Sequence, residues 1–276
     1  MIKLAVSFKG VIKDYILAHG LYEPTKQTKY TLDQILDVIE YVLITGSSWR
    51  SLDLPIFKSA GFKWRSIYYH FQKFSDNHVF ENVYNNLLNK YFKTNKSGKL
   101  KYLSVDSSFI KNEYASNVGV NGFYKKKRLS KLSLVTDSNG VPISAILAKG
   151  NYADQTLFYK NISNMMVQIT QNNKNNKHKR YMLADAAYDT NEIRSTISSL
   201  NIHPIIWHVR RNRKDKTKNK KFSKKETMIY NRRIIIENCF SWLYKNRRIN
   251  RRYDKLNSSY KSFMYMAFIR LIIRKM

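Results

Sequence analysis

The spacing of apolar residues predicts helices in the first third of the chain. Residues 31–46, TLDQILDVIEYVLITG, place their apolar side chains on one helical face. Thr31 and Gln34 have the spacing of a capping box, and Gly46 stands where a helix commonly ends. Two more helical patterns follow, the second of which ends near residue 92. We therefore expect residues 1–95 to be all-helical.

The pattern changes after the polar segment 94–100, where we place a domain boundary. Short apolar runs typical of β-strands end before Asp106, Thr136 and Asp185, and two more cover residues 143–148 and 204–209. Helical patterns cover residues 154–170, 190–200 and 227–250. We read Asp154 as a helix start and Asp189 as the N-cap of the helix that follows it. The order of elements predicts an α/β domain over residues 101–276, with a mixed sheet and flanking helices.

The charge of the chain points to a polyanionic partner. Fifty Lys and Arg face nineteen Asp and Glu, which gives a formal net charge of +31. Part of the lysine excess could have a plainer origin in an AT-rich gene. No apolar run approaches the roughly 18–20 residues that span a bilayer, and no signal-peptide core is evident. Cys239 is the single cysteine, which fits a reducing compartment. We expect a cytoplasmic protein that acts where the host DNA resides and is not secreted.

Basic residues gather in three places. Residues 210–225 have no apolar periodicity and are expected to form a mobile basic loop. Residues 245–255, KNRRINRRYDK, are rich in arginine, whose guanidinium can fork onto phosphates. The N-terminal helices carry Arg65, His70 and Lys73, which suits a DNA-binding module. A solvated loop and a helical bundle with a basic face are the plainer alternatives for the first and the third.

Three acids stand out against this positive charge. Asp106 and Asp185 each follow an apolar strand-like run, so they could project from adjacent strand ends, and Glu237 lies in a helical pattern that could reach the same point. Phosphodiester cleavage is aided by two divalent ions, and hard cations such as Mg²⁺ prefer oxygen ligands. The plainer alternative for Glu237 is an ordinary ion pair with Arg233, four residues earlier. On a continuous helix Tyr230, Arg233 and Glu237 share one face with Tyr244 and Arg248.

Several motifs resemble those of the DDE transposases of bacterial insertion sequences, specifically the insertion-sequence-five group. GSSWRSLDLP at residues 46–55 is similar to the WR-x-LP segment of that group, and VDSS at 105–108 resembles its first catalytic Asp. KKKRLSKLSLVTDSNGVP, ending at Pro142, is similar to the family's basic strand and DxxGxP turn. LADAAYD, ending at Asp189, resembles LADKGYD, and YNRRIIIENCF, from Tyr230, is similar to the Y-x-x-R-x-x-x-E signature.

This resemblance implies an RNase H-like core with Asp106, Asp185 and Glu237 as catalytic and metal-binding residues. It implies two Mg²⁺ or Mn²⁺ ions, and it places Tyr230 and Arg233 on transposon-end DNA. The family usually has Lys seven residues after the Glu, whereas this chain has Tyr244 there and Lys245 next to it. The middle motif also reads AAY where the family has KGY.

We therefore predict a DDE transposase that binds double-stranded DNA at transposon ends and in the target, and that works as at least a homodimer. The residues expected to hold DNA are Tyr230, Arg233, Lys245, Arg247, Arg248, Arg251 and Arg252. Two alternatives stay open: a transposase-derived DNA-binding protein without cleavage activity, and another RNase H-like nuclease. The Tyr244 position favours the former, and the intact trio of acids argues against it.

Overall fold

The computed structural model describes residues 7–25, 29–53, 63–93, 99–112, 115, 118–121, 127–172, 179–208 and 221–276. The chain divides into two compact units. Unit 1 comprises Met1–Lys90, Ile110–Asn117 and Trp242–Met276, and unit 2 comprises Tyr91–Phe109 and Val118–Ser241. This division differs from the boundary expected near residues 95–101, because the last 35 residues cluster with the N-terminal helices rather than with the sheet.

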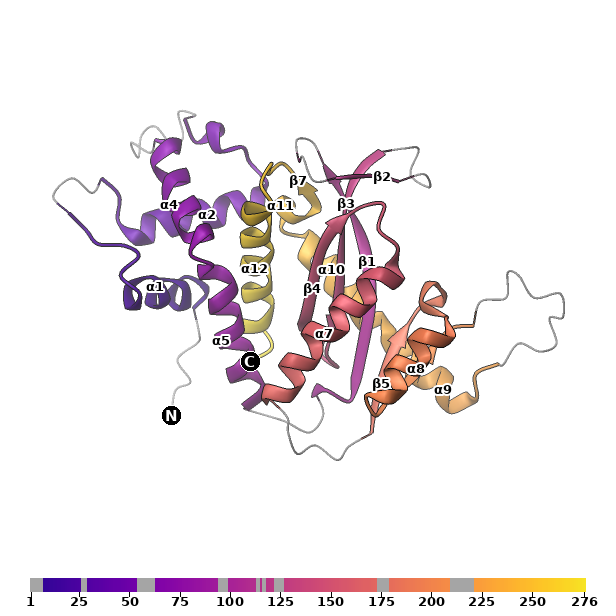
Figure 1. Ribbon diagram of the computed structural model, residues 1–276. Coiled ribbons are helices and arrows are strands. Elements are labelled where there is room, and N and C mark those ends of the chain that lie inside the picture. Colours follow the sequence, from indigo (N-terminus) through magenta and orange to yellow (C-terminus); the bar gives the residue numbers. More distant parts are fainter. Residues whose placement is uncertain are drawn as a thin grey trace. The chain divides into compact units, whose positions relative to one another are not determined.

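Unit 1 is helical, as expected for residues 1–95 (Figure 1). Its elements are α1 (Phe8–Ala18), α2 (Leu32–Thr45), a 3₁₀ turn (Trp49–Asp53), α4 (Trp64–Asp76), α5 (Val79–Lys93), α11 (Arg247–Asn250), the short strand β7 (Arg251–Arg252) and α12 (Asn257–Ile273). The predicted capping box of α2 is confirmed, since Thr31 and Gln34 bond reciprocally to each other's backbone N–H. Gly46 ends the helix in the left-handed region, with φ of 70°.

Helix α12 supplies the core of unit 1. Eleven of its residues are buried, on all sides of the helix, as expected of a helix surrounded by others. Phe263 stacks on Phe71 of α4 with ring centroids 4.6 Å apart, and it also meets Trp49. Tyr84 of α5 packs against Phe268. The N-terminal helices therefore bury their apolar faces against the C-terminal end of the chain.

Unit 2 is built on a mixed sheet. Its strands are β1 (Tyr102–Asn112), β2 (Gly119–Asn121), β3 (Lys127–Thr136), β4 (Pro142–Lys149), β5 (Arg180–Ala184) and β6 (Ile202–Ile206). The order is β2-β3-β1-β5-β6, and β4 pairs with β3. The pairs β2–β3 and β3–β4 are antiparallel, whereas β1–β5 and β5–β6 are parallel. The predicted mixed sheet is confirmed.

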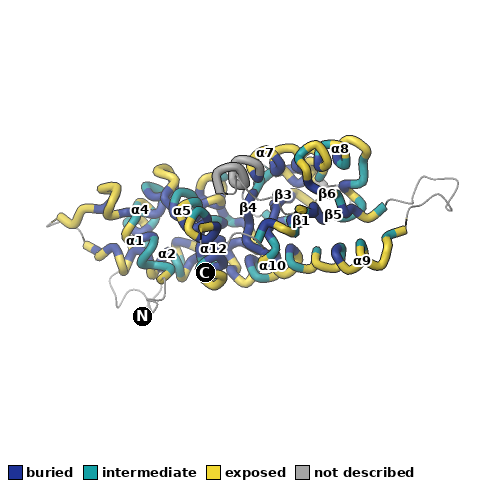
Figure 2. Tube along the Cα trace, turned by 90° about the horizontal axis from the view of Figure 1, so that it is seen from below, coloured by how far each residue is buried: buried dark blue, intermediate teal, exposed yellow. Residues whose placement is uncertain are grey.

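Helices cover both faces of this sheet. Figure 2 shows α7 (Asp154–Asn172) and α8 (Asn191–Ser199) on one face, with α9 (Lys224–Tyr230) and α10 (Ile234–Tyr244) on the other. Asp154 starts α7, as predicted. The turn between β3 and β4 holds Gly140 with φ of 80°, and a Cβ there would meet Ile235 of α10 at 3.1 Å. A glycine is therefore needed where α10 passes this turn.

Three expectations about local structure differ from what is observed. Strand β1 continues through Asp106 to Asn112, and its last two residues, which belong to unit 1, pair with β7. The helix predicted over 227–250 is interrupted by a 3₁₀ turn at Asn231–Arg233 and again after Tyr244. The N-cap of α8 is Thr190, not Asp189, which instead pairs with Arg194.

Part of the predicted basic loop lies outside the described residues. Of residues 210–225, only 221–225 are described, and α9 begins at Lys224. Ser223 caps α9 through a second capping box with Glu226. Among the helices of the described residues, none is both long and apolar enough to cross a bilayer.

Candidate active site

Asp106 and Asp185 occupy equivalent positions on neighbouring parallel strands. Tyr102 of β1 pairs with Tyr181 of β5, and the register runs on through Ser104 and Leu183. Continued by two residues, the same register sets Asp106 beside Asp185, the residue directly after β5. Neighbouring strands lie about 4.8 Å apart, so the two carboxylates start from adjacent backbone positions. The structure therefore brings these two predicted residues together.

Arg233 connects Asp106 to Glu237. Its guanidinium donates a hydrogen bond from Nη1 to Oδ2 of Asp106 at 2.8 Å, and Nη2 pairs with Oε1 of Glu237. From the sequence, this ion pair with Arg233 was the alternative to a catalytic role for Glu237. The additional contact with Asp106, 127 residues earlier, makes the arginine a bridge between two of the three predicted acids.

The elements around Arg233 explain its position. Ile229, at the end of α9, is buried in a cluster with Leu183 of β5 and Ile205 of β6, and Tyr230 packs against the same cluster. On α10 the residues Ile236, Phe240 and Leu243 are buried, which leaves Glu237 on the exposed side. The 3₁₀ turn between the two helices therefore places Arg233 beside Asp106.

The electrostatics of the site reflect its burial. Burial raises the pKa of Asp106 above its ordinary value, while a hydrogen bond from the Ser107 N–H and the charge of Arg233 oppose that shift. The charge of Asp185 adds to the rise, which is a second sign that the two aspartates are close. Burial also raises the pKa of Tyr230, while the charge of Arg233 opposes that shift.

A buried cluster adjoins these acids that the sequence analysis did not single out. Lys131 of β3 is almost fully buried, and its Nζ donates to Asp154 Oδ1 at 3.1 Å and to the Tyr152 carbonyl at 2.9 Å. Ser107, next to Asp106, donates its hydroxyl to the same Asp154 oxygen. The signal in the sequence was a lysine directly before the apolar run that ends at Thr136, and that pattern alone does not reveal burial.

Tyr188 was missed as well. Its side chain is buried, and burial is the largest cause that raises its pKa, with the charges of Asp154, Asp106 and Asp185 acting in the same direction. It belongs to the LADAAYD segment, two residues after the start of the 3₁₀ turn that Asp185 caps. A buried phenol thus lies close enough to the two aspartates to be affected by their charges.

The donor set fits a hard divalent cation only in part. Asp106 and Asp185 offer two carboxylates at adjacent positions, and Mg²⁺ is commonly held by one or two carboxylates together with substrate phosphates and water. Within the part of the chain that the structure describes, no group of three His, Cys, Asp or Glu side chains could hold a metal ion. Glu237 is therefore not assembled with the aspartates into a metal-binding trio, and Arg233 stands between it and Asp106.

Two of the predicted DNA contacts are buried in unit 1. Arg248 is 3% exposed, pairs with Asp254 through Nε and Nη2, and donates to the Ser47 carbonyl. Arg252 is fully buried and hydrogen-bonded to the Asp254 carbonyl and to Asn257. The prediction that these two arginines hold phosphates is therefore not supported. Both guanidinium groups instead form hydrogen bonds with buried acceptors inside unit 1.

The other predicted contacts are placed differently. Lys245, Arg247 and Arg251 are exposed in unit 1. Tyr244, at the position where the resembling family has lysine, is partly buried and close enough to Tyr260 to influence its pKa. Tyr230 and Arg233 lie in unit 2, where Arg233 contacts Asp106.

Comparison with solved structures shows the fold. The cryo-EM structure of a piggyBac transposase synaptic complex with hairpin DNA has a TM-score of 0.52 at 10% identity, covering 96% of this chain and 71% of that chain. The catalytic domain of the Mos1 mariner transposase, in a crystal structure, has a TM-score of 0.31 at 12% identity, covering 61% of this chain and 89% of that one. The second score is too low to carry an argument. The first shows that this chain shares the fold of that protein over most of its length.

Comparison with sequence families is decisive. No curated protein matches this chain. The family model described as "Transposase DDE domain" matches residues 97–272, which is more than half of the chain and contains all three predicted acids. The chain belongs to the transposase DDE domain family.

Proposed function

We propose that this protein cuts and joins DNA phosphodiesters at the ends of a mobile element, with Asp106, Asp185 and Glu237 as its catalytic carboxylates. Family membership carries the coarser function, a transposase enzyme that acts on DNA with divalent metal ions. The observation that supports the site most strongly is the register that sets Asp106 beside Asp185 on parallel strands.

Asp106 and Asp185 would hold the first Mg²⁺ or Mn²⁺ ion, and Glu237 would join them to hold a second. When bound, the ions would activate a water or a 3′-hydroxyl and stabilise the leaving oxygen. Glu237 is the most exposed of the three acids and lies on α10, so a rotation of its side chain away from Arg233 would free it for this role. Arg233 would then be available to a DNA phosphate, with the Tyr230 hydroxyl beside it.

Exposed basic residues would bind the rest of the DNA. Lys245, Arg247 and Arg251 keep the role predicted for them, because their side chains are exposed. Arg248 and Arg252 would act indirectly, by fixing the segment that carries the exposed three. We further propose that two copies act together, since joining two element ends requires two sites.

A DNA-binding protein that no longer cleaves is a second candidate. The observation that favours it is the Arg233 bridge, which leaves the three acids without a common metal-binding point in the described residues. In a protein that does not cleave, Arg233 would permanently neutralise the acids. Tyr244 would stand where the resembling family has a lysine that this chain has lost.

A cleavage assay separates the two candidates. A labelled duplex that carries the element's end is incubated with the protein and with Mg²⁺ or Mn²⁺, and nicking is followed over time. We expect wild type to nick and Asp185→Asn and Glu237→Gln to lose at least about a hundredfold in rate, since each substitution removes a carboxylate that would hold the metal ions. Glu192→Gln, an exposed acid on α8, is the matched control. Equal nicking rates in all variants would show that the proposed catalytic residues are wrong, whereas no metal-dependent nicking by wild type would favour the non-cleaving candidate.

A further inference from the structure

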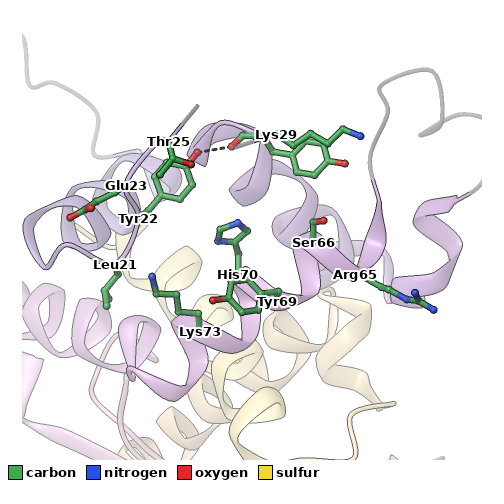
Figure 3. Close-up of a pocket in the computed structure, with 11 residues that line it drawn as sticks. Leu21, Tyr22, Glu23, Thr25, Lys29, Arg65, Ser66, Tyr69, His70 and Lys73 are labelled. Carbon is green, nitrogen blue, oxygen red and sulfur yellow. Dashed lines mark hydrogen bonds between the residues drawn. The ribbon is translucent and has the colours of Figure 1, made fainter. Parts of the chain in front are cut away.

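Lys131 of β3 is a buried lysine, which sets it apart from the cations that face solvent. Lys29 and Arg65, for example, are exposed in the wall of a hollow of about 470 Å³ beside α4 (Figure 3). Lys131, in contrast, is 4% exposed. Removing an ammonium group from water costs free energy unless partners inside the protein compensate for it. The partners of Lys131 therefore indicate what its charge is for.

Three groups surround the ammonium of Lys131. Its Nζ donates to Asp154 Oδ1 at 3.1 Å and to the Tyr152 carbonyl at 2.9 Å. It also lies 4.7 Å from the centroid of the Phe109 ring. Asp154 is the first residue of α7, and Phe109 belongs to β1, the strand beside β3 in the sheet. Lys131 therefore ties the start of α7 to the centre of the sheet.

Asp154 connects Lys131 to the strand that carries Asp106. The Asp154 oxygen that accepts from Lys131 also accepts the hydroxyl of Ser107. The backbone N–H of Ser107 in turn donates to Oδ1 of Asp106 at 2.8 Å. We call Lys131, Asp154 and Ser107 the Lys131 cluster. Its hydrogen bonds lead from a buried cation to the backbone that holds the Asp106 carboxylate.

The Lys131 cluster and the Asp106 carboxylate lie on opposite faces of β1. Successive side chains of a strand point to opposite faces. Ser107 contacts Asp154 of α7, whereas Asp106 contacts Arg233, directly before α10. Figure 2 shows α7 and α10 on opposite faces of the sheet. The cluster therefore acts on Asp106 through the strand backbone, and its side chains need not touch metal or DNA.

Strand β1 loses support from its neighbour just before Asp106. In the described part of the chain, the pairing of β1 with β5 ends at Ser104 and Leu183. Strand β5 stops at Ala184, and Asp185 then caps a 3₁₀ turn. The backbone ladder that fixes this side of β1 therefore does not extend past the catalytic position. The hydroxyl of Ser107, held by Asp154, supplies an attachment where the ladder ends.

The start of α7 is also attached to the turn that carries the second aspartate. Gln155, next to Asp154, donates from its side chain to the Ala187 carbonyl at 3.3 Å. The backbone N–H of the same Ala187 donates to Oδ1 of Asp185 at 2.8 Å. The first two residues of α7 thus contact both segments that carry aspartates. The cation that anchors this helix end can therefore influence the spacing of the two carboxylates.

We propose that Lys131 is a positioning residue for the carboxylate site: through Asp154 and Ser107 it fixes the Asp106 carboxylate relative to Asp185. The proposal rests on the proposed function, in which these two aspartates hold a divalent ion. Altering a residue that orients a metal ligand typically costs about 10–100-fold in metal affinity or activity.

Two simpler roles for Lys131 lead to different expectations. If Lys131 only stabilises the fold, its replacement lowers the free energy of unfolding and leaves the metal affinity of the folded protein unchanged. If Lys131 acts only through its charge, its removal tightens the binding of a divalent cation nearby, because a like charge is gone. A positioning role predicts the opposite sign, weaker metal binding by a folded protein.

The test measures the affinity of the full chain for Mn²⁺ without DNA, by electron paramagnetic resonance of the unbound ion. We expect Lys131→Met and Ser107→Ala each to bind Mn²⁺ about tenfold more weakly than wild type. Ser107→Thr keeps the hydroxyl and should bind like wild type. Lys149→Met, an exposed lysine of β4, changes the net charge equally and is the matched control. Circular dichroism checks that each variant is folded.

A double variant tests whether Lys131 acts through Ser107. In a protein that already carries Ser107→Ala, Lys131→Met should cost no further Mn²⁺ affinity, because the connection is already broken. Losses that simply add would overturn the proposal. So would unchanged or tighter Mn²⁺ binding by folded Lys131→Met.

A charge-neutral replacement keeps the proposal testable if Lys131→Met does not fold. Lys131→Met combined with Asp154→Leu replaces the ion pair by apolar side chains, so it leaves no unpaired charge inside unit 2 and preserves the net charge. It also removes the acceptor of the Ser107 hydroxyl. We expect this variant to bind Mn²⁺ as weakly as Ser107→Ala does, and affinity equal to that of wild type would overturn the proposal.

Failure of this proposal can be told apart from failure of the proposed function. If Asp185→Asn loses Mn²⁺ binding and nicking while the Lys131 variants bind Mn²⁺ normally, the positioning role falls and the function stands. If Asp185→Asn binds Mn²⁺ as tightly as wild type, the proposed metal site falls and the positioning role falls with it.

Discussion

The guanidinium of Arg233 donates to Asp106 at 2.8 Å and pairs with Glu237 at the same time. A single positive charge therefore joins two acids that a divalent cation would otherwise join. Arg233 is mostly buried, as is Asp106, so the contact is shielded from solvent. The arginine therefore neutralises charge at the site from within the chain.

Removal of this arginine should strengthen metal binding by the free protein. In Arg233→Ala the two acids lose their internal counterion, and we expect Mn²⁺ affinity without DNA to rise about fivefold to tenfold, the size of one charge-assisted contact. Electron paramagnetic resonance of free Mn²⁺ measures this directly. Arg232→Ala is the control, because Arg232 lies over the Tyr102 ring and not on an acid. Equal Mn²⁺ affinity in both variants would show that Arg233 does not compete with the metal.

The buried pair of Arg248 and Asp254 should matter for stability. Both side chains are at most 5% exposed, so Arg248→Ala leaves an unpaired carboxylate inside unit 1. We expect the free energy of unfolding to fall by about 3–5 kcal/mol. Arg247→Ala, at the exposed neighbouring position, should change it by no more than about 0.5 kcal/mol. Urea denaturation followed by circular dichroism gives both values, and similar values for the two variants would contradict a structural role for Arg248.

Asp137 should make stability depend on pH. Burial raises its pKa to about 6, against hydrogen bonds from Tyr91, Val141 and Asn139 that lower it. Because the folded state holds the proton more tightly than the unfolded chain, the contribution of this group is fully present below about pH 4 and is lost as pH rises through 6.

The variant Asp137→Asn removes this titration. Between pH 4 and 7 we expect the free energy of unfolding of wild type to fall relative to that of Asp137→Asn, as measured by denaturation at several pH values. Asp76→Asn, an exposed acid at the end of α4, is the control and should run parallel to wild type. Parallel curves for wild type and Asp137→Asn would mean that Asp137 does not titrate in this range.

Local patterns predicted local structure well. The capping box of Thr31 and Gln34, the start of α7 at Asp154 and most strands follow from residues close together in the chain. The neighbouring positions of Asp106 and Asp185 could also be anticipated, because both follow apolar runs that became parallel strands. The assignment of three acids to catalysis stays a prediction, supported by the family match.

Contacts between distant residues could not be predicted in the same way. Arg248 and Arg252 look like exposed basic residues in the sequence, yet the acceptors that bury Arg248 include the Ser47 carbonyl, 201 residues earlier. Arg233 and Asp106 are 127 residues apart in the sequence, so the helical spacing could predict only the ion pair between Arg233 and Glu237. Lys131 is buried because Asp154 and Tyr152 reach it from the start of α7. Periodicity carries no information about such partners.

The central claim is that Asp106 and Asp185 hold one divalent metal ion between them. Iron-directed cleavage of the protein tests it without relying on DNA cleavage: Fe²⁺ replaces Mg²⁺, ascorbate and peroxide generate radicals at the bound ion, and mass spectrometry locates the cuts. We predict cuts next to Asp106 and Asp185 that excess Mg²⁺ suppresses and that Asp185→Asn removes. Cuts elsewhere in the chain, or the same cuts in Asp185→Asn, would contradict the account.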